Sequence, residues 1–390
     1  MGEAYIVAAG RTAGGRRGGR VSGVHPADLA GKVLDELVVR AGADPARIED
    51  VIMGCVSQFG QQSGNIGRNA VMASSLPESV PATSVDRQCG SSQQALSFAA
   101  ATVMSGQMDM VIAAGVESMS RVPMGAAAKL AHEANLGSPN SPKIKTRYNG
   151  HQFSQFVGAE MIAKKYNLSK DELDAFGFES HRRAIAATNG GAFKDEIIAV
   201  EVVLPDGSTE LHTIDEGIRF DSSLDGIRAV KLLVEEGRLT AATSSQICDG
   251  ASGVLVVNER GLKELGVAPL ARIHAMTVIG EDPVIMLEAP INATRRVLDR
   301  AGMKLSDIDL FEVNEAFASV PAAWLQSLGA DPAKLNVNGG AIALGHPLGA
   351  SGTKLMSTLI YALKARGQKW GLQTMCEGGG LANATIIEIL

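Results

Sequence analysis

The fold is decided by residues 86–106, which read DRQCGSSQQALSFAAATVMSG. From Gly90 onward the small and apolar residues follow a helical pattern that ends at Gly106, and the apolar run over 110–115 then predicts a strand. The chain before this stretch alternates in the same way, with expected strands at 4–9, 51–56 and 82–85 and expected helices at 26–42 and 67–75. Short connections between alternating strands and helices predict an α/β fold with a parallel or mixed sheet.

The C-terminal part of the chain repeats this plan. Its expected strands lie at 308–313, 371–376 and 384–389, and its expected helices at 316–328 and 352–366. In the first half Cys89 opens a helix and Gly115 closes the next strand, and in the second half Ala350 and Cys376 take these places. The interval is 26 positions in both halves. The sequence therefore predicts two duplicated α/β halves with a site where they meet.

The segment between about 120 and 240 differs from both halves in composition. It is more polar, and Ser169 with Glu172 forms a capping-box pattern for a helix over 168–189. Strand character returns at 251–258. We expect an N-terminal half made of residues 1–120 with about 241–265, an inserted loop domain of residues 121–240 that covers the site as a lid, and a C-terminal half of residues 266–390.

Bulk properties argue against several classes of protein. The 390-residue chain has a net charge of −6, which argues against nucleic acid as the main partner because phosphate binding needs a basic surface. Its four cysteines lie far apart and form no CxxC pair, so we expect neither a metal site nor a redox dithiol. The sequence has no basic and apolar leader and no 18-residue apolar stretch, so we expect a cytoplasmic protein without a membrane span.

Two residues stand out as candidates for acid–base and nucleophilic chemistry. Cys89 directly precedes the long helix, where the helix dipole and unpaired N–H groups favour a thiolate and could stabilise an oxyanion. His346 lies in GGAIALGHPLGASG, where small residues let a ligand approach an imidazole that can act as a general base. Taken alone, each is better explained structurally, Cys89 as a buried small residue in a turn and His346 as a turn histidine.

Two further candidates lie at strand ends in the C-terminal half. Cys376 ends a strand and begins CEGGG, a turn without side chains that leaves the sulfur uncovered. Asn314, in VNEAF, could fix a water or a carbonyl group, or could simply be the N-cap of the helix that follows. All four candidates fall at strand ends or helix starts, where ligand sites of α/β sheets form, so together they indicate one active site.

Five motifs make the resemblance to a known family specific: DRQCGSSQQAL, AGVESMS, NEAF, GGAIALGHPLGASG and CEGGG. In this order and spacing they resemble the motif set of the thiolase family over essentially the whole chain. The resemblance implies a thiolase fold, in which two βαβαβαββ-type halves form five layers (α-β-α-β-α) with an inserted loop domain. It also implies a homodimer or homotetramer.

The resemblance implies a role for each candidate. Cys89 takes up the acyl group, His346 activates it, Cys376 moves the proton at the substrate α-carbon or coenzyme thiol, and Asn314 orders a water. The N–H groups of Cys89 and Gly378 would form one oxyanion hole, and His346 with the water on Asn314 the other. Two cysteines suit the chemistry, because a Claisen condensation needs an acyl-enzyme and a separate proton shuttle.

The same resemblance implies contacts to acyl-CoA and CoA, with coenzyme A as a co-substrate and no tightly bound cofactor. Ser245, in TSSQICDGAS, matches a serine that contacts the pantetheine arm, and Met286 and Phe317 match positions that line the acyl pocket. The remaining candidates for substrate or coenzyme A binding are Gln155, Arg219, Phe220, Asp221 and Ser222.

The expected activity is CoA-dependent cleavage of a 3-ketoacyl-CoA to acetyl-CoA and a shortened acyl-CoA, in the degradative direction. Ser154 and Gln155 stand where acetoacetyl-specific members carry His-Met, which favours longer or bulkier acyl chains. Glu377 departs from the small apolar residue more often found after the second cysteine, and its charge can alter the pKa of Cys376.

Several alternatives stay open at this point. An acetoacetyl-CoA thiolase would share every motif. A non-catalytic thiolase-like binding subunit is opposed by the intact reactive residues. A 3-ketoacyl synthase would carry Cys-His-His, and a cysteine hydrolase would release a free acid.

Overall fold

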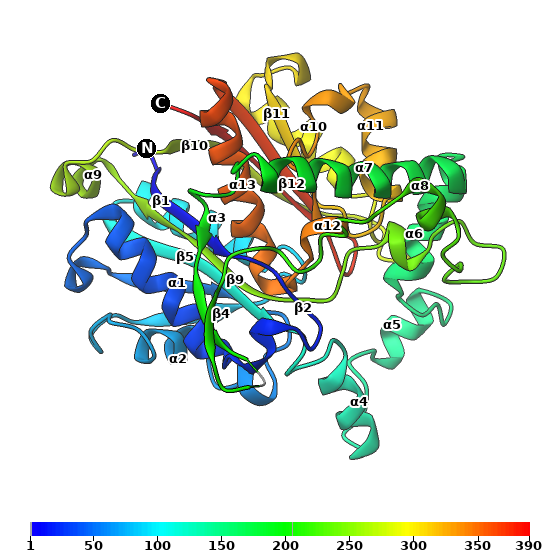
Figure 1. Ribbon diagram of the computed structural model, residues 1–390, viewed down its shortest axis with the longest axis horizontal. Helices are drawn as coiled ribbons and strands as arrows, with labels where there is room; N and C mark the ends of the chain where they lie inside the picture. Colours follow the sequence, from blue (N-terminus) through cyan, green and yellow to red (C-terminus); the bar gives the residue numbers. More distant parts are fainter. Residues whose placement is uncertain (1, 205) are drawn as a thin grey trace.

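The computed structural model describes residues 2–204 and 206–390 and contains two α/β halves that pack against each other (Figure 1). The N-terminal half consists of β1 (Tyr5–Thr12), β2 (Gly15–Arg16), α1 (Pro26–Ala41), β3 (Asp50–Gly54), α2 (Ile66–Met72), β4 (Ala82–Val85), α3 (Ser91–Met104), β5 (Met110–Ser118), β9 (Cys248–Val257) and α9 (Glu259–Leu265). The C-terminal half consists of β10 (Ala271–Gly280), α10 (Pro290–Ala301), β11 (Leu310–Val313), α11 (Ser319–Leu328), α12 (Ala341–Leu344), α13 (Ser351–Arg366), β12 (Trp370–Glu377) and β13 (Leu381–Glu388). Each strand and helix expected in the two halves is present, with ends that agree to within three residues.

The two halves share one pattern of strand pairing, which confirms the duplicated α/β fold. In the N-terminal half β3 pairs in parallel with β4 and β5, and β9 runs antiparallel between β5 and β1. In the C-terminal half β11 pairs in parallel with β12, and β13 runs antiparallel between β12 and β10. A parallel bridge between Phe311 and Leu335 stands where β4 lies in the other half.

The edges of the two half-sheets also meet. β1 and β10 pair antiparallel through Tyr5 with Arg272 and Ile6 with Ala271, so one sheet runs in the order β11-β12-β13-β10-β1-β9-β5-β3-β4. The hydrophobic pattern did not predict this junction, because pairing between strands far apart in the chain leaves no periodic signal.

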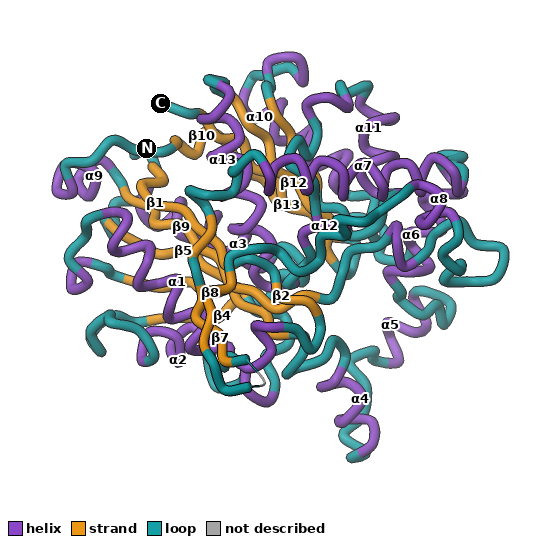
Figure 2. Tube along the Cα trace, in the orientation of Figure 1, coloured by secondary structure: helices purple, strands orange, loops and turns teal. Residues whose placement is uncertain are grey.

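Figure 2 shows the strands inside the molecule, with α1 and α2 beside the N-terminal half-sheet and α10 beside the C-terminal one. Three apolar cores lie between the sheets and these helices. The middle core lies between the half-sheets, where α3 packs against α13 through residues such as Leu96 and Leu359. The outer cores lie under α1 and α2 on one side and under α10 on the other. The two middle helices approach closely, because a Cβ at Gly352 would lie only 2.1 Å from the main-chain nitrogen of Gln93. β5 is buried along its whole length, which explains its continuous apolar run.

The inserted segment shares its packing with both halves. It contains α4 (Ala126–Glu133), α5 (Pro142–Arg147), α6 (Gln155–Lys165), α7 (Lys170–Asn189), β6 (Ile197–Ile198), β7 (Val200–Val203), β8 (Thr209–His212) and α8 (Leu224–Arg228). α6 packs on α11, whereas Val200 and Val202 of β7 join the outer core of the N-terminal half. α4 and α5 bury no residue and project from the molecule (Figure 1). The predicted capping box of Ser169 and Glu172 at the start of α7 is confirmed.

Helix α11 begins at Ser319, three residues after the predicted start at Ala316. The main-chain oxygen of Ala316 accepts a hydrogen bond from the N–H of Ser245, and the N–H of Ala318 donates to the oxygen of Thr243. Ala316 and Ala318 therefore bond to the segment 243–245 and not within the helix, so α11 begins only at Ser319. In the described part of the chain, every helix is too short or too polar to cross a bilayer.

Candidate active site

Cys89 lies in a tight turn that directly precedes α3. Gln88 adopts a positive φ of 50°, and the Ser91 hydroxyl fixes the turn by accepting from the N–H of Arg87 and donating to the oxygen of Gln88. The N-cap of α3 is Gly90, so Cys89 stands one residue before the helix cap. The Cys89 side chain packs beside Met119, Leu348 and Met375, which come from both halves.

The expectation that helix α3 favours a Cys89 thiolate is wrong for the resting protein. Burial, followed by the charge of Glu377, raises the pKa of the Cys89 thiol to about 12. Hydrogen bonding from the N–H groups of Cys89 and Gly378 lowers this pKa, but by less than burial raises it. Cys89 is therefore a neutral thiol that needs a base, and the two N–H groups lie where negative charge would develop.

His346 is the candidate for this base, and polar partners on both ring nitrogens hold its imidazole in place. Its Nδ1 lies 2.5 Å from the Ser351 hydroxyl, which donates to the main-chain oxygen of Pro347. Its Nε2 lies 3.4 Å from Nδ2 of Asn314, an amide nitrogen that can only donate. These partners place the proton on Nδ1 and the lone pair on Nε2. Burial, with Lys354 nearby, lowers the pKa of His346 to about 3, so the ring is neutral.

Asn314 lies just after β11 and does not cap α11, since the N-cap position there is Ala318. Its Nδ2 faces His346, while its Oδ1 is buried without a hydrogen-bond partner among the described residues. A buried carbonyl oxygen of this kind can accept a hydrogen bond from an ordered water.

Cys376 reaches the same place from the other half. It is fully buried near the end of β12 and belongs to an apolar cluster with Met286 and Phe317. Burial raises the pKa of its thiol well above the usual value, and negative charge on Cys89 raises it further. The structure therefore brings Cys89, Cys376 and the two residues predicted to line the acyl pocket into one region.

Two residues that support the site were missed from the sequence. Ser351 fixes the tautomer of His346, and its place five positions downstream in HPLGAS was the available signal. Glu117, buried in the AGVESMS motif, accepts hydrogen bonds from the N–H groups of Val56, Ser57 and Gly349 and from Nε2 of Gln62. Glu117 thereby ties the loop after β3 to the loop that carries His346.

A cavity of about 370 Å³ lies beside the inserted segment. It is lined by three of the four residues in the loop 219–222 that were predicted to bind substrate or coenzyme A. Arg219, Asp221 and Ser222 line it, together with His181 and Gln246. The Arg219 N–H donates to Nδ1 of His181, and burial lowers the pKa of His181 to about 4. Ser245 stands next to the lining residue Gln246, although its own side chain is not part of the lining.

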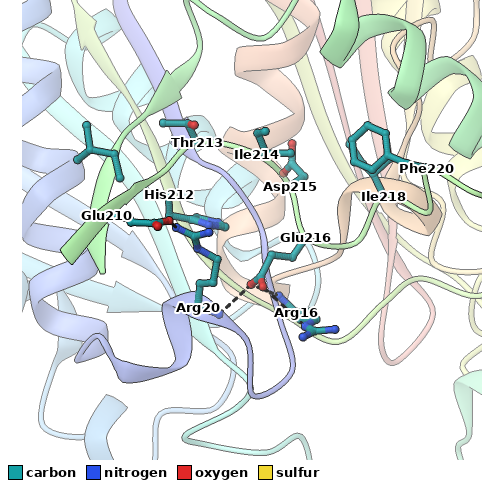
Figure 3. Close-up of a pocket in the computed structure, with 11 residues that line it drawn as sticks. Arg16, Arg20, Glu210, His212, Thr213, Ile214, Asp215, Glu216, Ile218 and Phe220 are labelled. Atoms are coloured by element: carbon teal, nitrogen blue, oxygen red, sulfur yellow. Dashed lines mark hydrogen bonds and ion pairs between the residues drawn. The ribbon is translucent and has the colours of Figure 1, made fainter. Parts of the chain in front are cut away.

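Phe220, the fourth residue of that loop, faces a different groove of about 370 Å³ (Figure 3). There Arg20 pairs with Glu210 at 2.6 Å and Arg16 with Glu216 at 3.7 Å, so basic and acidic charges offset each other. The structure therefore separates Phe220 from Arg219: the N–H of Ser222 bonds to the oxygen of Arg219 and closes a turn, and Phe220 lies within that turn and lines the other groove.

The remaining predicted contact, Gln155, begins α6. Its Nε2 lies 3.7 Å from the sulfur of Met124, and the ring of the next residue, Phe156, packs edge-on against Phe317 at 5.5 Å. The start of α6 thus meets the Met286 and Phe317 cluster. Among the residues that the structure describes, no group of three His, Cys, Asp or Glu side chains has the arrangement of a metal site.

Comparisons with known proteins agree with this arrangement. A family model described as the thiolase N-terminal domain matches residues 4–260, and one described as the thiolase C-terminal domain matches residues 267–389. The chain is 50 % identical to the steroid 3-ketoacyl-CoA thiolase FadA6 of Mycobacterium tuberculosis, covering 100 % of this chain and 95 % of that protein. It is 38 % and 41 % identical to 3-ketoacyl-CoA thiolases of Bacillus subtilis and Yersinia pestis, with both chains fully covered. The resemblance inferred from the motifs is confirmed, and the chain belongs to the thiolase family of acyltransferases.

Proposed function

We propose that this protein cleaves 3-ketoacyl-CoA substrates with coenzyme A, in the degradative direction, through an acyl group carried on Cys89. The observation that carries the proposal is that Cys89, on the turn before α3, lies near Cys376 of the other half and beside the N–H groups of Cys89 and Gly378. His346 lies two residues before Leu348, which packs beside Cys89. The names of the relatives, which are 3-ketoacyl-CoA thiolases, support the substrate class.

In the first step, His346 Nε2 accepts the proton of Cys89, and the sulfur attacks the 3-keto carbon of the substrate. The oxygen of that carbon gains negative charge, which the N–H groups of Cys89 and Gly378 stabilise. The bond between C2 and C3 then breaks and its electron pair moves into the thioester of the departing acetyl-CoA. Cys376 gives its proton to C2, which completes acetyl-CoA and leaves the shortened acyl group on Cys89.

In the second step, the thiol of free coenzyme A attacks the acyl carbon on Cys89. The thiol proton passes to the deprotonated Cys376, and the sulfur of Cys89 leaves and is protonated by His346. The product is the shortened acyl-CoA, and the enzyme returns to its starting state. Both steps place negative charge near the same N–H groups, so one preorganised site serves both.

We propose that coenzyme A lies along the cavity lined by Arg219, Asp221 and Ser222. An arginine side chain suits the phosphates of the coenzyme, and the cavity adjoins the 243–246 segment that bonds to Ala316. We assign Ser245 to the pantetheine arm, as the motif implies. Phe220 is left outside this binding site because it lines the other groove.

We further propose that the acyl pocket accepts longer, bulkier or ring-bearing chains. Ser154 and Gln155 at the start of α6, next to the Phe156 and Phe317 pair, stand in place of the His-Met pair expected in acetoacetyl-specific members. Each methylene that the pocket buries contributes up to about 0.8 kcal/mol. A few methylenes therefore change kcat/KM by about one to two orders of magnitude.

The test is CoA-dependent cleavage of a graded series, from acetoacetyl-CoA through medium and long 3-ketoacyl-CoAs to ring-bearing ones. We expect kcat/KM to rise with size above the four-carbon substrate. A flat or falling series would instead identify an acetoacetyl-CoA thiolase. Complete inactivity toward every member, in folded protein, would indicate a binding subunit.

We also expect a homodimer or homotetramer, as the family resemblance implies. Light scattering after size-exclusion chromatography measures the mass directly, and a monomer at micromolar concentration would contradict this expectation.

A further inference from the structure

Glu377 is a buried carboxyl group inside the active site that the mechanism above does not use. It is the last residue of β12, between Cys376 and Gly378, and its side chain is fully buried. Neither of its carboxyl oxygens has a hydrogen-bond partner among the described residues. A buried carboxylate without partners is costly, so Glu377 in its charged form does not stabilise the fold.

The carboxyl group of Glu377 fills the space beside the turn that carries Cys89. A Cβ built on Gly90 would lie 1.9 Å from Oε1 and 2.5 Å from Cδ of Glu377. The absence of a side chain at Gly90 therefore makes room for this carboxyl group. Since Cys89 and Gly90 are neighbours, Glu377 lies against the nucleophile as well as next to Cys376 in sequence.

Four titratable or charged groups define the electrostatics of this place. Cys89 lies on the turn before α3, Cys376 lies on β12, and Arg87 lies on the same turn as Cys89. Glu117, on β5, is close enough for its charge to raise the pKa of Cys89. Neither carboxyl oxygen of Glu377 has a bonded partner within the described part of the chain, so Arg87 acts on it through its charge alone.

Burial raises the pKa of Glu377 to about 8, against the opposing effects of Arg87 and of the main-chain N–H of Asn383, which lies near the carboxyl group. Its carboxyl group is therefore protonated and neutral near pH 7. As a carboxylate it adds the second-largest contribution, after burial, to the raised pKa of Cys89.

We propose that Glu377 is a positioning residue that permits the Cys89 thiolate only while its own carboxyl group is protonated. The neutral carboxyl group keeps the turn and the oxyanion hole packed without adding charge. Loss of its proton places a negative charge against the sulfur that must itself become negative, so Glu377 switches nucleophile formation off at alkaline pH. The inference rests on the proposed role of Cys89 as the acylated nucleophile.

The test is the pH dependence of Cys89 alkylation by iodoacetamide in the free enzyme, followed on the Cys89 peptide by mass spectrometry. Thiolate formation alone raises the rate about tenfold per pH unit below the thiol pKa. In the wild type this rise should stop near pH 8, because each proton lost from Glu377 opposes the next loss from Cys89. In Glu377→Gln the rise should continue, so the ratio of variant to wild-type rate grows about tenfold per unit above pH 8.

A matched control is Glu78→Gln, because Glu78 is exposed between α2 and β4. Its alkylation profile should follow the wild-type profile, including the break near pH 8. Parallel profiles for wild type and Glu377→Gln, or a wild-type profile without a break, would overturn the proposal. The break in the wild type keeps the test decisive even where Glu377→Gln fails to fold.

A second readout separates this inference from the proposed function. The infrared band of a protonated carboxyl group should disappear from the wild type as pH rises through about 8 and should be missing from Glu377→Gln. If the band titrates in this way but no acyl group is found on Cys89 during turnover, the proposed role of Cys89 as nucleophile is refuted. The protonated state of Glu377 would still stand. Acylation of Cys89 with no such band would refute the role of Glu377 alone.

Discussion

Glu117 and Glu377 occupy the same position in the two duplicated strands, but their surroundings are opposite. Each is the eighth residue of its strand, Glu117 in β5 and Glu377 in β12, and each side chain is fully buried. Glu117 receives hydrogen bonds from three main-chain N–H groups and one side-chain amide. Glu377 receives none from the described residues.

The difference shows that two equivalent positions of a duplicated fold can have different roles. A buried carboxylate surrounded by donors stabilises the fold, because each donor offsets the loss of water. A buried carboxyl group without donors cannot be held as an anion at low cost, so it keeps its proton and responds to pH. Glu117 therefore holds together the loops that form the site. Glu377 lies close enough to change the pKa of Cys89.

The largest effect that the comparison predicts concerns the turn after β12. Cys376→Ser should lower α-proton exchange on acetyl-CoA by about 10³-fold, because general acid–base groups contribute about 10²- to 10⁴-fold. Acylation of Cys89 should persist, since Cys376 acts on the departing carbon and not on the nucleophile. Exchange followed by NMR in deuterated water measures the first quantity, and unimpaired exchange would remove Cys376 from the proton-transfer role.

The next prediction concerns the glutamate on the other strand. Glu117→Gln replaces an acceptor oxygen by an amide that faces donors, so it should lower the free energy of unfolding by about 3 to 4 kcal/mol. Thermal unfolding of wild type and variant measures this loss, and a variant as stable as the wild type would contradict the comparison.

A smaller effect of opposite sign is expected for Glu377→Gln. The native pKa of about 8 lies above the ordinary value of 4.5, so the native state binds a proton that the unfolded state has lost between these values. This contribution to wild-type stability is therefore fully present below pH 4.5 and is lost as pH rises toward 8.

Glutamine has no proton to lose, so the variant should become more stable relative to the wild type as pH rises. The gain between pH 6 and pH 8 should be about 2 kcal/mol, at about 1.4 kcal/mol per pH unit. Melting curves of both proteins across this range give the difference. A constant difference would mean that Glu377 does not titrate in the folded protein.

Much of the fold followed from the sequence because strand and helix periodicity is local. The interval shared by Cys89 to Gly115 and Ala350 to Cys376 predicted the duplication, and the shared order of strand pairing confirms it. The register moves the match by one residue: Asp50 pairs with Val111 and Leu310 with Gly371, so Gly115 corresponds to Met375. The join of β1 to β10 was missed, because long-range pairing of Tyr5 with Arg272 has no local signal. The late start of α11 was missed for the same reason, since Ser245 takes the oxygen of Ala316.

The reactive residues were also found from sequence, because their motifs are contiguous. The pKa of Cys89 was not predicted correctly. Its position before a helix predicted a favoured thiolate, whereas burial and the charge of Glu377 raise its pKa. Ser351 and Glu117 were missed because their partners, His346 and the N–H groups of two separate loops, are identified only by geometry. Phe220 was assigned with Arg219 as one loop, but side-chain direction places it in another groove.

The central claim is that Cys89 holds the acyl group after the first step of the reaction and until coenzyme A takes it up in the second. The most direct measurement is peptide mass spectrometry after incubation with an acyl-CoA in the absence of free coenzyme A. The account predicts an acyl adduct on the Cys89 peptide, its loss on addition of coenzyme A, and no adduct in Cys89→Ser. A stable adduct on Cys376 alone, or turnover without any adduct on Cys89, would contradict it.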